Sequence, residues 1–402
     1  MYGKLIDTAI EKLSDQFKAV DEIAFVNQQK VLNAFINNRV ALRHFNPTTG
    51  YGYDDVARDT LNKIYAEVFG TEDAIVSPLI TSGTHALTIA LFGLLRPNQT
   101  LLCITGKPYD TLNDVIFGEG YGSLKDFGVR CKIVPLKDGA PDIPAIKAAI
   151  RGENPSVVMI QRSRGYDMRP ALSVEQINKL IALADRQKSK ILLDNCYGEF
   201  VQATEPSQAD AIVGSLIKNV GGGIAPTGGY ICGSRAAINM IEGRLTAPSI
   251  GREVGSYAGD YRLFYQGLFM APHVTAQSVK TAMLFSQVLS ALGYETMPKP
   301  NEKFFDIICS VKFGDENKLI DFCKTIQSAS PVDSFAAPEP WDMPGYNDKV
   351  IMAAGAFVQG ASIELSCDAP IRPPYIAYFQ GGLTLEHGII ALRKCVAALG
   401  GE

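Results

Sequence analysis

The chain has 402 residues, more than a single hydrophobic core usually supports, so two domains that share an interface are expected. Apolar residues make up 47% and charged residues 20%, which is typical of a globular protein, and no apolar run is long enough to cross a bilayer. The 38 basic and 42 acidic residues give a net charge of −4 without a block of Lys or Arg, which argues against nucleic-acid binding.

The amino-terminal stretch "MYGKLIDTAIEKLSDQ" is amphipathic and has no apolar signal core, so we expect a cytoplasmic protein. The eight cysteines are scattered without CxxC pairs and the four histidines stand apart. Neither a disulfide framework nor a metal site is therefore predicted.

We expect residues 1–50 to form an N-terminal helical segment, residues 51–285 a large domain and residues 286–402 a smaller C-terminal domain.

Helices and strands alternate through the large domain. The predicted elements, in chain order, are a helix over 53–70, a strand over 74–77, a helix over 84–95, strands over 100–105 and 155–161, a helix over 173–187, and strands over 190–195 and 210–213. Ser173 and Gln176 form a capping box at the start of the last helix, and Gly70 is a natural helix end. Strands that are apolar on both faces and alternate with helices predict an α/β fold with a mostly parallel sheet covered on both sides.

Beyond about residue 285 the pattern is looser and predicts a smaller α+β domain. A Pro-rich loop over 330–348 separates its two halves. The predicted elements are a strand over 304–314, a helix over 316–327, a strand over 360–367 and a helix over 384–399.

The unusual polar residues of the large domain follow its predicted strands. In open α/β sheets, ligands bind beyond the carboxyl ends of the strands. Tyr109 and Asp194 follow two of these strands, and Ser215 and Lys218 follow a third. The stretch "TSGTHA", with Ser82, Gly83 and Thr84, lies where a helix begins.

An aspartate directly after a buried strand is costly unless it meets a cation, and Lys218 follows Asp194 by 24 residues, after the next strand. A single ligand, pyridoxal phosphate, would give both Asp194 and Lys218 a partner. A carboxylate holds its pyridine nitrogen protonated, a lysine forms a Schiff base with it, an aromatic ring stacks on it, and a helix amino terminus binds its phosphate. Backbone N–H groups of "SGTHA" and the Ser215 hydroxyl are the predicted phosphate donors.

Each of these residues has an ordinary interpretation when taken alone. Lys218 suits a solvated strand end, Asp194 a helix N-cap and Tyr109 a core aromatic. Their shared position at strand ends favours the cofactor site over coincidence. The glycine-rich "GGGIAPTGG" lacks the strand, GxGxxG, helix order of a dinucleotide loop.

Several motifs carry a resemblance to a known family. "SGTHA", "PYDT", "DNCYGEF" and "SLIKN" resemble, in this order, the pattern of the cystathionine lyase and methionine γ-lyase group of fold type I pyridoxal phosphate enzymes. From about residue 45 to the end, the chain is more closely similar to the methionine γ-lyase-like family whose members are often labelled aluminium resistance proteins. The stretches that carry this likeness are "TGYGYDD", "QRSRGY", "GSLIKNVGGGIAPTGGYICG", "YQGLFMAPHV" and "IELSCDAPIRPPY".

The resemblance implies a large cofactor-binding domain, aminotransferase-like in fold, and a role for each matched residue. Lys218 would be the Schiff-base lysine, Asp194 the partner of the pyridine nitrogen and Tyr109 the stacking ring. The glycines after Lys218 would let the backbone pass close to the cofactor. Ser82, Gly83, Thr84 and Ser215 would bind the phosphate.

The resemblance also implies a homotetramer in which a neighbour's tyrosine reaches the phosphate, and Tyr51 and Tyr53 are the candidates. The wider lyase group has Tyr-x-Arg at this point, and the arginine is the one implied to bind the phosphate. This chain has Tyr53 in its place, so Arg58 is the candidate substitute. The arginine that binds the substrate carboxylate in that group is replaced here by Glu364. The nearest cation is Arg372, which we predict to bind the carboxylate, with Arg162 and Arg164 next in line.

These inferences predict a pyridoxal phosphate-dependent carbon–sulfur lyase that acts on a sulfur-containing amino acid of the cystathionine, methionine or cysteine type. Lys218 would remove the Cα proton, with a pKa lowered by burial and by neighbouring positive charge. The natural substrate and the choice between β- and γ-elimination stay open. Two alternatives also stay open: an aminotransferase or decarboxylase on the same scaffold, and a non-catalytic metal-tolerance protein, which the lack of ligand clusters disfavours.

Overall fold

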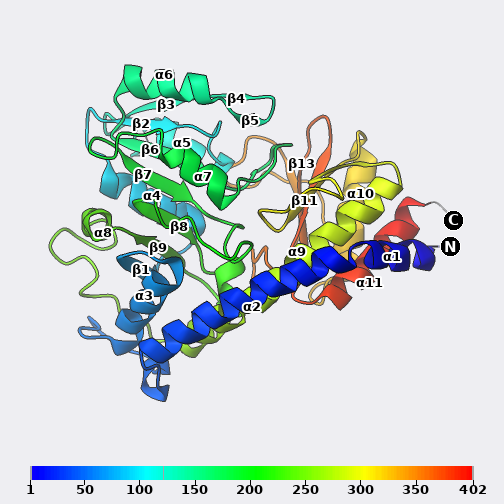
Figure 1. The fold of residues 1–402 in the computed structure, drawn as a ribbon, viewed down its shortest axis with the longest axis horizontal. Helices are drawn as coiled ribbons and strands as arrows, with labels where there is room; N and C mark the ends of the chain where they lie inside the picture. Colours follow the sequence, from blue (N-terminus) through cyan, green and yellow to red (C-terminus); the bar gives the residue numbers. More distant parts are fainter. Residues whose placement is uncertain (1, 121, 401–402) are drawn as a thin grey trace.

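The computed structural model describes residues 2–120 and 122–400, which form a seven-stranded sheet and a five-stranded sheet with helices packed on both (Figure 1). Alternate residues of the larger sheet enter opposite cores. Ile212, for example, belongs to the core on one face and Val213 to the core on the other. The larger sheet is therefore buried on both sides, as the apolar strands predict.

In the seven-stranded sheet, β9 pairs antiparallel with both of its neighbours and the other described pairs are parallel. The predicted large, mostly parallel sheet is confirmed. Its five predicted strands are present, whereas β3 and β9 were not predicted. In spatial order the strands are β1 (Asp73–Ser77), β9 (Gly229–Gly233), β8 (Ala211–Ser215), β7 (Lys190–Asp194), β6 (Val157–Gln161), β2 (Thr100–Cys103) and β3 (Arg130–Ile133).

Local sequence signals set the helices of this domain. Ser173 Oγ accepts a hydrogen bond from Gln176 N at 3.2 Å, and Gln176 Oε1 accepts one from Ser173 N at 2.8 Å, so the predicted capping box is confirmed. Gly70 ends its helix at φ 65°, a left-handed conformation that suits glycine. The elements are α3 (Val56–Phe69), α4 (Gly83–Leu94), α5 (Asn113–Phe117), α6 (Ile143–Glu153), α7 (Val174–Ile181) and α8 (Arg235–Glu242), with the short helices η2 (Asp110–Leu112) and η3 (Asn219–Gly221) and the strand pair β4 (Leu136–Lys137) and β5 (Ala140–Pro141).

The smaller sheet is antiparallel throughout its described pairs. The predicted strand over 304–314 and the two predicted helices are present, whereas β10, β12 and β14 were not predicted. In spatial order the strands are β10 (Glu295–Met297), β11 (Ile308–Lys312), β14 (Ile376–Gln380), β13 (Ser366–Pro370) and β12 (Val350–Ala353), and the helices are α10 (Glu316–Ser328) and α11 (Leu385–Leu399).

The strand predicted over 360–367 is wrong for most of its length, because β13 begins only at Ser366. The buried Ile363 and Leu365 produce the alternation that suggested a strand. Glu364, between them, turns its carboxylate to the backbone N–H groups of Phe357 and Val358, at 2.9 and 3.0 Å. This local pairing holds an irregular loop where a sheet ladder was expected.

Two long helices run alongside each other and connect the domains: α2 (Ser14–Asn37) and α9 (Arg262–Ala291) (Figure 1). Leu268 of α9 lies in the core of the large domain and Leu284 in the core of the small one. The predicted domain boundary after residue 285 falls within this helix. The segment before the large domain also contains α1 (Tyr2–Lys12), which packs into the core of the small domain, and the short helix η1 (Leu42–Phe45).

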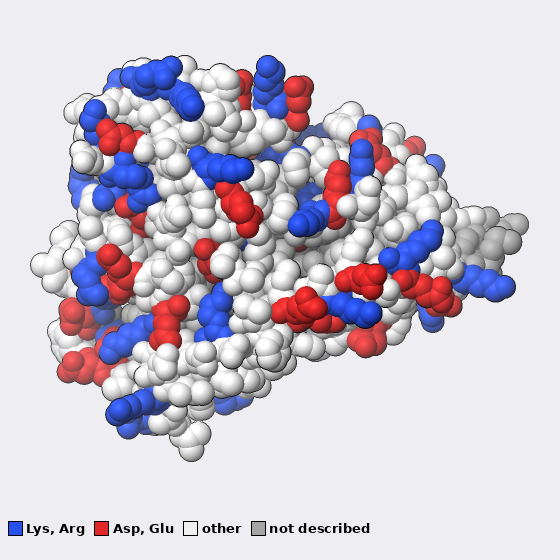
Figure 2. All heavy atoms as spheres, viewed as in Figure 1, with Lys and Arg blue, Asp and Glu red and all other residues white. Residues whose placement is uncertain are grey.

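Acidic and basic side chains are interspersed over the face shown in Figure 2, and no large area of that face carries a single sign of charge. Within residues 2–120 and 122–400, no helix combines the length and the apolar character that a membrane crossing requires.

The glycines that follow Lys218 bring the η3 turn against α9. A Cβ atom on Gly222, which has φ +54°, would lie 2.5 Å from the carbonyl oxygen of Gly267 in α9. A Cβ atom on Gly221 would overlap the carbonyl oxygen of Leu216. The turn that carries Lys218 is therefore fixed by close backbone packing that a larger residue would disrupt.

We expect Gly221→Ala to lower the free energy of unfolding by on the order of 3 kcal/mol, because the added methyl group has no space and the turn must shift. Urea unfolding of the wild type and the variant measures the change. Gly152→Ala, in α6, is the matched control, since a Cβ there meets nothing within 4 Å. That control should gain about 0.5 to 1 kcal/mol, because alanine favours helix. Equal stability of the two variants would contradict the packing described.

Candidate functional site

The carboxyl ends of β6, β7 and β8 meet at one edge of the large sheet, because their register pairs Gln161 with Asp194 and Asp194 with Val213. A cavity of about 220 Å³ lies at this edge. Its walls include Asp194 from β7 and Asp368 from β13, so it lies between the two domains.

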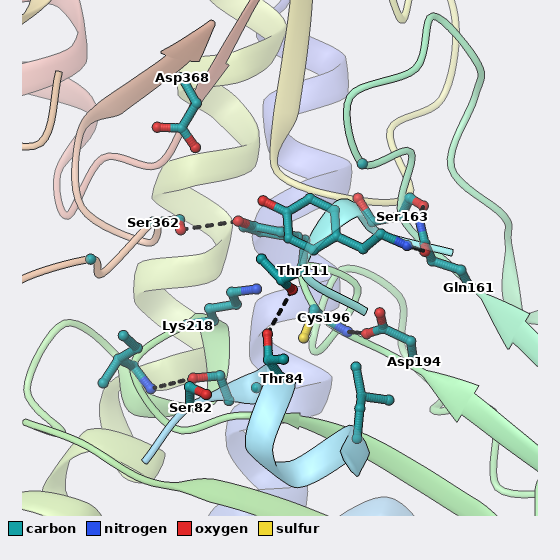
Figure 3. A pocket seen from close by; sticks show the side chains of 18 of the residues that line it. Ser82, Thr84, Thr111, Gln161, Ser163, Asp194, Cys196, Lys218, Ser362 and Asp368 are labelled. Carbon is teal, nitrogen blue, oxygen red and sulfur yellow. Dashed lines mark hydrogen bonds between the residues drawn. The ribbon is translucent and has the colours of Figure 1, made fainter. Parts of the chain in front are cut away.

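Seven of the predicted site residues line this cavity, although they come from segments far apart in the sequence (Figure 3). They come from the start of α4, the loop after β2 and the ends of β7 and β8. The structure therefore brings together the residues singled out at strand ends. They are Ser82, Gly83, Thr84, Tyr109, Asp194, Ser215 and Lys218.

Asp194, the last residue of β7, is 6% exposed. Its Oδ1 accepts a hydrogen bond from Cys196 N at 3.1 Å. Burial raises the pKa of Asp194, against the charge of Lys218 and the hydrogen bonds from Cys196, which lower it. In the described chain no cation lies within ion-pair distance of this carboxylate, so its position favours a protonated nitrogen as a bound partner.

Lys218 lies on the turn after β8, where its backbone N–H donates to Ser215 O at 3.3 Å. Its Nζ atom points into the cavity and lies 4.2 Å from the centroid of the Tyr197 ring (Figure 3). Burial lowers the pKa of Lys218, but the acidic groups of Cys196, Tyr197 and Asp194 outweigh burial and raise it above its ordinary value. The prediction of a lowered lysine pKa is therefore wrong for the protein chain alone.

The glycines after Lys218 have a different role from the one predicted. Gly221, Gly222 and Gly223 do not line the cavity. Gly222 instead packs against the backbone of α9 at Gly267. These glycines let the turn that carries Lys218 pack closely on its neighbours outside the cavity, rather than making room for a cofactor.

The start of α4 offers hydrogen-bond donors to an anion. Ser82 is the N-cap, and its Oγ accepts from His85 N at 3.0 Å, so the first turn of the helix is oriented toward the cavity. A Cβ atom on Gly83 would lie 3.4 Å from Ser215 Cβ, so the start of α4 and the end of β8 are close together here. The hydroxyls of Thr84 and Ser215 line the same end, and the helix dipole favours negative charge there.

Tyr109 is held in one orientation. Its backbone N–H donates to Gln161 Oε1 at 2.8 Å, and its Oη lies 2.6 Å from Tyr346 Oη. Burial raises the pKa of Tyr109 well above its usual range, so the phenol is neutral. Tyr346 comes from the loop over 330–348, which the sequence marked only as a Pro-rich connection.

Other lining residues were not predicted. Tyr197 has φ 71°, a left-handed conformation that is uncommon for a residue other than glycine, and its Oη lies 3.0 Å from Ser362 Oγ. Its place three residues after Asp194 was a usable signal. Ser362 and Asp368 belong to the small domain, and nothing in their local sequence shows that they face the cavity.

Some predicted residues lie elsewhere. Tyr51 and Tyr53 are 71% and 65% exposed, outside this chain's cavity, so a role in a neighbour's site stays a prediction. Arg58 donates to Gly52 O at 2.9 Å and lies in a separate surface groove. Arg372 is paired with Asp348 at 2.7 Å in another groove. Its predicted role in binding the substrate carboxylate gains no support from this position.

The two arginines of "QRSRGY" are fully buried in networks outside the cavity lining. Arg162 donates to Asn195 Oδ1 at 2.9 Å, and Arg164 forms an ion pair with Asp306 at 3.1 Å. Their guanidinium groups are committed to these internal partners. Among the described residues, no three His, Cys, Asp or Glu side chains are grouped as a metal ion would require.

The donor set fits pyridoxal phosphate. A buried carboxylate without a cation faces the same cavity as a lysine whose Nζ makes no hydrogen bond within the described chain, and a helix begins beside both. On a mostly parallel sheet with a smaller antiparallel domain, this arrangement defines the fold type I class of pyridoxal phosphate-dependent proteins.

Comparison with known proteins identifies the family of the chain. The model of the methionine gamma-lyase family matches residues 2–400, so the chain belongs to that family and the resemblance seen in the sequence is confirmed. Three similar proteins illustrate the likeness. The "Uncharacterized protein YnbB" of Bacillus subtilis is 48% identical, with 99% of this chain and 97% of that protein covered.

The crystal structure of a "carbon-sulfur lyase involved in aluminum resistance" from Clostridium novyi NT has a TM-score of 0.95 and 49% identity, covering 99% of this chain and 96% of that one. The "pyridoxal-5'-phosphate dependent protein YhfS" from Escherichia coli has a TM-score of 0.64 at 16% identity, covering 94% of this chain and 97% of that one. This last likeness concerns the fold alone.

One further acid lies beside the lysine turn. Glu199 is fully buried, and its backbone oxygen accepts from Asn219 Nδ2 at 2.9 Å. Its Oε1 accepts from Tyr230 Oη at 2.8 Å, whereas Oε2 has no partner among the described residues. Burial raises the pKa of Glu199 to about 7.

We expect Glu199→Gln to stabilise the protein by about 3 kcal/mol at pH 8, since each pKa unit corresponds to about 1.4 kcal/mol. The raised pKa means that the folded state favours the protonated acid, so the wild type loses stability as the pH rises from 4.5 to 7. The variant, with a neutral amide at this position, should not lose stability over this pH range. Urea unfolding at pH 4.5 and pH 8 measures the difference, which should nearly vanish at the lower pH.

Glu11→Gln, on the exposed face of α1, is the matched control and should show no such pH-dependent gain. A Glu199→Gln variant that is less stable than the wild type at pH 8 would show that the buried carboxyl is needed in its charged form.

Proposed function

We propose that the protein is a pyridoxal phosphate-dependent carbon–sulfur lyase that acts on a sulfur-containing amino acid by β- or γ-elimination. The observation that carries the proposal is that Lys218 and Asp194, from the ends of adjacent strands, face one cavity beside the start of α4. The family match and the carbon–sulfur lyase among the similar structures support it.

The residues around the cavity divide between the parts of the cofactor. Lys218 would hold its carbonyl carbon and Asp194 its pyridine nitrogen. Tyr109 would stack on the ring, while Ser82, Gly83, Thr84 and Ser215 would bind the phosphate. When bound, pyridoxal phosphate supplies a ring that withdraws electrons from the substrate's α-carbon.

Two side chains of the protein would each handle one proton in this reaction. The Lys218 amine would accept the proton from the α-carbon and would then donate it to the departing sulfur. Asp194 would keep the ring nitrogen protonated, and its raised pKa suits a carboxyl that shares a proton with that nitrogen. Tyr109 stays neutral and is held by Tyr346. The carbon–sulfur bond then breaks and a thiol leaves.

The proposed assembly is a cytoplasmic homotetramer built from close dimers. Tyr51 and Tyr53, both exposed, would reach the phosphate of a neighbouring subunit. Their rings already lie next to each other, with centroids 5.5 Å apart.

We expect the purified protein to release a thiol from at least one sulfur amino acid and to carry a yellow cofactor. Borohydride should bleach the colour and fix a cofactor-sized mass on the peptide that contains Lys218. Lys218→Ala should lose both the fixed mass and the thiol release, because no other described cavity residue has an amine. Mass spectrometry of peptides and products measures both.

Lys18→Ala is the control, since Lys18 is exposed in α2 and should leave both results unchanged. A colourless protein that added pyridoxal phosphate does not alter would refute the proposal. Keto-acid exchange or CO2 release without a thiol would instead indicate an aminotransferase or a decarboxylase.

Asp194→Asn should keep the fold and part of the cofactor absorbance but slow removal of the α-proton by on the order of 100-fold, because an uncharged partner no longer stabilises the protonated ring. Exchange of the substrate's α-proton with deuterated solvent, followed by NMR, measures this step directly. Exchange at the wild-type rate would mean that Asp194 does not hold the ring nitrogen.

A further inference from the structure

The charged residues that line the cavity are few. Within the described chain they are Asp194, Lys218 and Asp368. The proposed function uses the first two to hold the cofactor. Asp368 enters from the small domain, on the opposite side from Ser82 and Thr84 (Figure 3). The proposed function gives Asp368 no role in cofactor binding, which leaves its charge free to contact a substrate.

Asp368 is only 8% exposed, which makes its charge costly to leave unpaired. Its Oδ2 accepts a hydrogen bond from Gln380 Nε2 at 3.0 Å. Among the described residues no cation lies within ion-pair distance of either oxygen. Burial raises the pKa of Asp368 to about 6, against the effects of Gln380, Lys218 and the Tyr166 hydroxyl, so the carboxylate is still mostly ionised at pH 7.

No arginine of the described residues forms an ion pair with Asp368. Arg372 is paired with Asp348, and Arg164 with Asp306, and neither lines the cavity. The unpaired negative charge would repel an anionic substrate side chain and attract a cationic one.

Two fixed tyrosine rings share this part of the cavity. Tyr346 is held by Tyr109, with 2.6 Å between their hydroxyl oxygens, and packs on Tyr166 with centroids 5.7 Å apart. Tyr197 is held by Ser362, and a cation, Lys218 Nζ, already lies over its ring. Electron-rich ring faces beside a carboxylate are a favourable environment for an ammonium group.

We propose that Asp368 is a specificity-determining residue that selects substrates with an ammonium group on the side chain, beyond the sulfur atom. This inference rests on the proposed function, because it gives a role to the small-domain side of the same cavity. The ammonium would pair with the Asp368 carboxylate and lie against the ring of Tyr346. Neutral thioethers would lack this interaction, and anionic ones would be repelled.

The test compares three probes of similar length: S-(2-aminoethyl)cysteine, S-propylcysteine and S-(carboxymethyl)cysteine, together with the corresponding homocysteine derivatives. We expect the wild type to favour the cationic probe over the neutral one by at least about tenfold in kcat/KM for thiol release, with the anionic probe poorest. Asp368→Asn should remove most of this preference. Asn can still accept the hydrogen bond from Gln380, so the variant should fold.

Asp15→Asn, a change of equal size at a residue whose side chain is 94% exposed, is the control and should keep the wild-type preference. A second measurement is independent of turnover. L-lysine and L-norleucine have side chains of similar length and no leaving group, and calorimetry measures their binding to the holoenzyme. The wild type should bind lysine more tightly, and Asp368→Asn should bind the two alike.

The outcomes separate this inference from the proposed function. Thiol release at equal rates from cationic and neutral probes would overturn the inference and leave the lyase assignment intact. No thiol release from any probe, with lysine still favoured through Asp368, would overturn the lyase assignment and support the charge selection. A wild type that binds lysine no better than norleucine would overturn the inference whatever the turnover.

Discussion

A carboxylate buried at the end of a strand is the constraint around which the site is organised. Asp194 must find a positively charged or donating partner, because the cost of an isolated buried charge is several kcal/mol. β6 and β8 hold β7 in register on both sides, so the acid cannot turn to solvent. The lysine turn, the start of α4 and the fixed ring of Tyr109 are arranged around this one point, and together they leave room for a ligand that partners the acid.

The position of Lys218 depends on packing that lies outside the cavity. The η3 turn approaches α9 so closely that Gly222 and Gly267 nearly touch backbone to backbone. Because α9 also forms part of the small-domain core, the same helix sets both the lysine and the domain that carries Asp368. One helix therefore packs both against the turn that carries Lys218 and in the core of the domain that carries Asp368.

The large-domain half of the site could be predicted from sequence, because parallel strands put the residues that follow them at one edge. Asp194, Tyr109 and Lys218 were found in this way. The small-domain half could not, because Asp368 reaches the cavity through antiparallel pairing and domain packing, and Ser362 reaches it from an irregular loop. The strand expected over 360–367 failed for a related reason: Glu364 satisfies backbone N–H groups locally, which alternation of apolar residues does not reveal.

The chain path through the two cores has a consequence for biosynthesis. Ile6 and Ala9 of α1 share a core with Val396 of α11, so α1 packs against a segment that is synthesised much later than α1 itself. This core cannot be completed until the residues of α11 have been made, and until then the apolar face of α1 lacks these partners. A chain released early would keep that face uncovered, which makes a truncated product a natural target for chaperones and proteases.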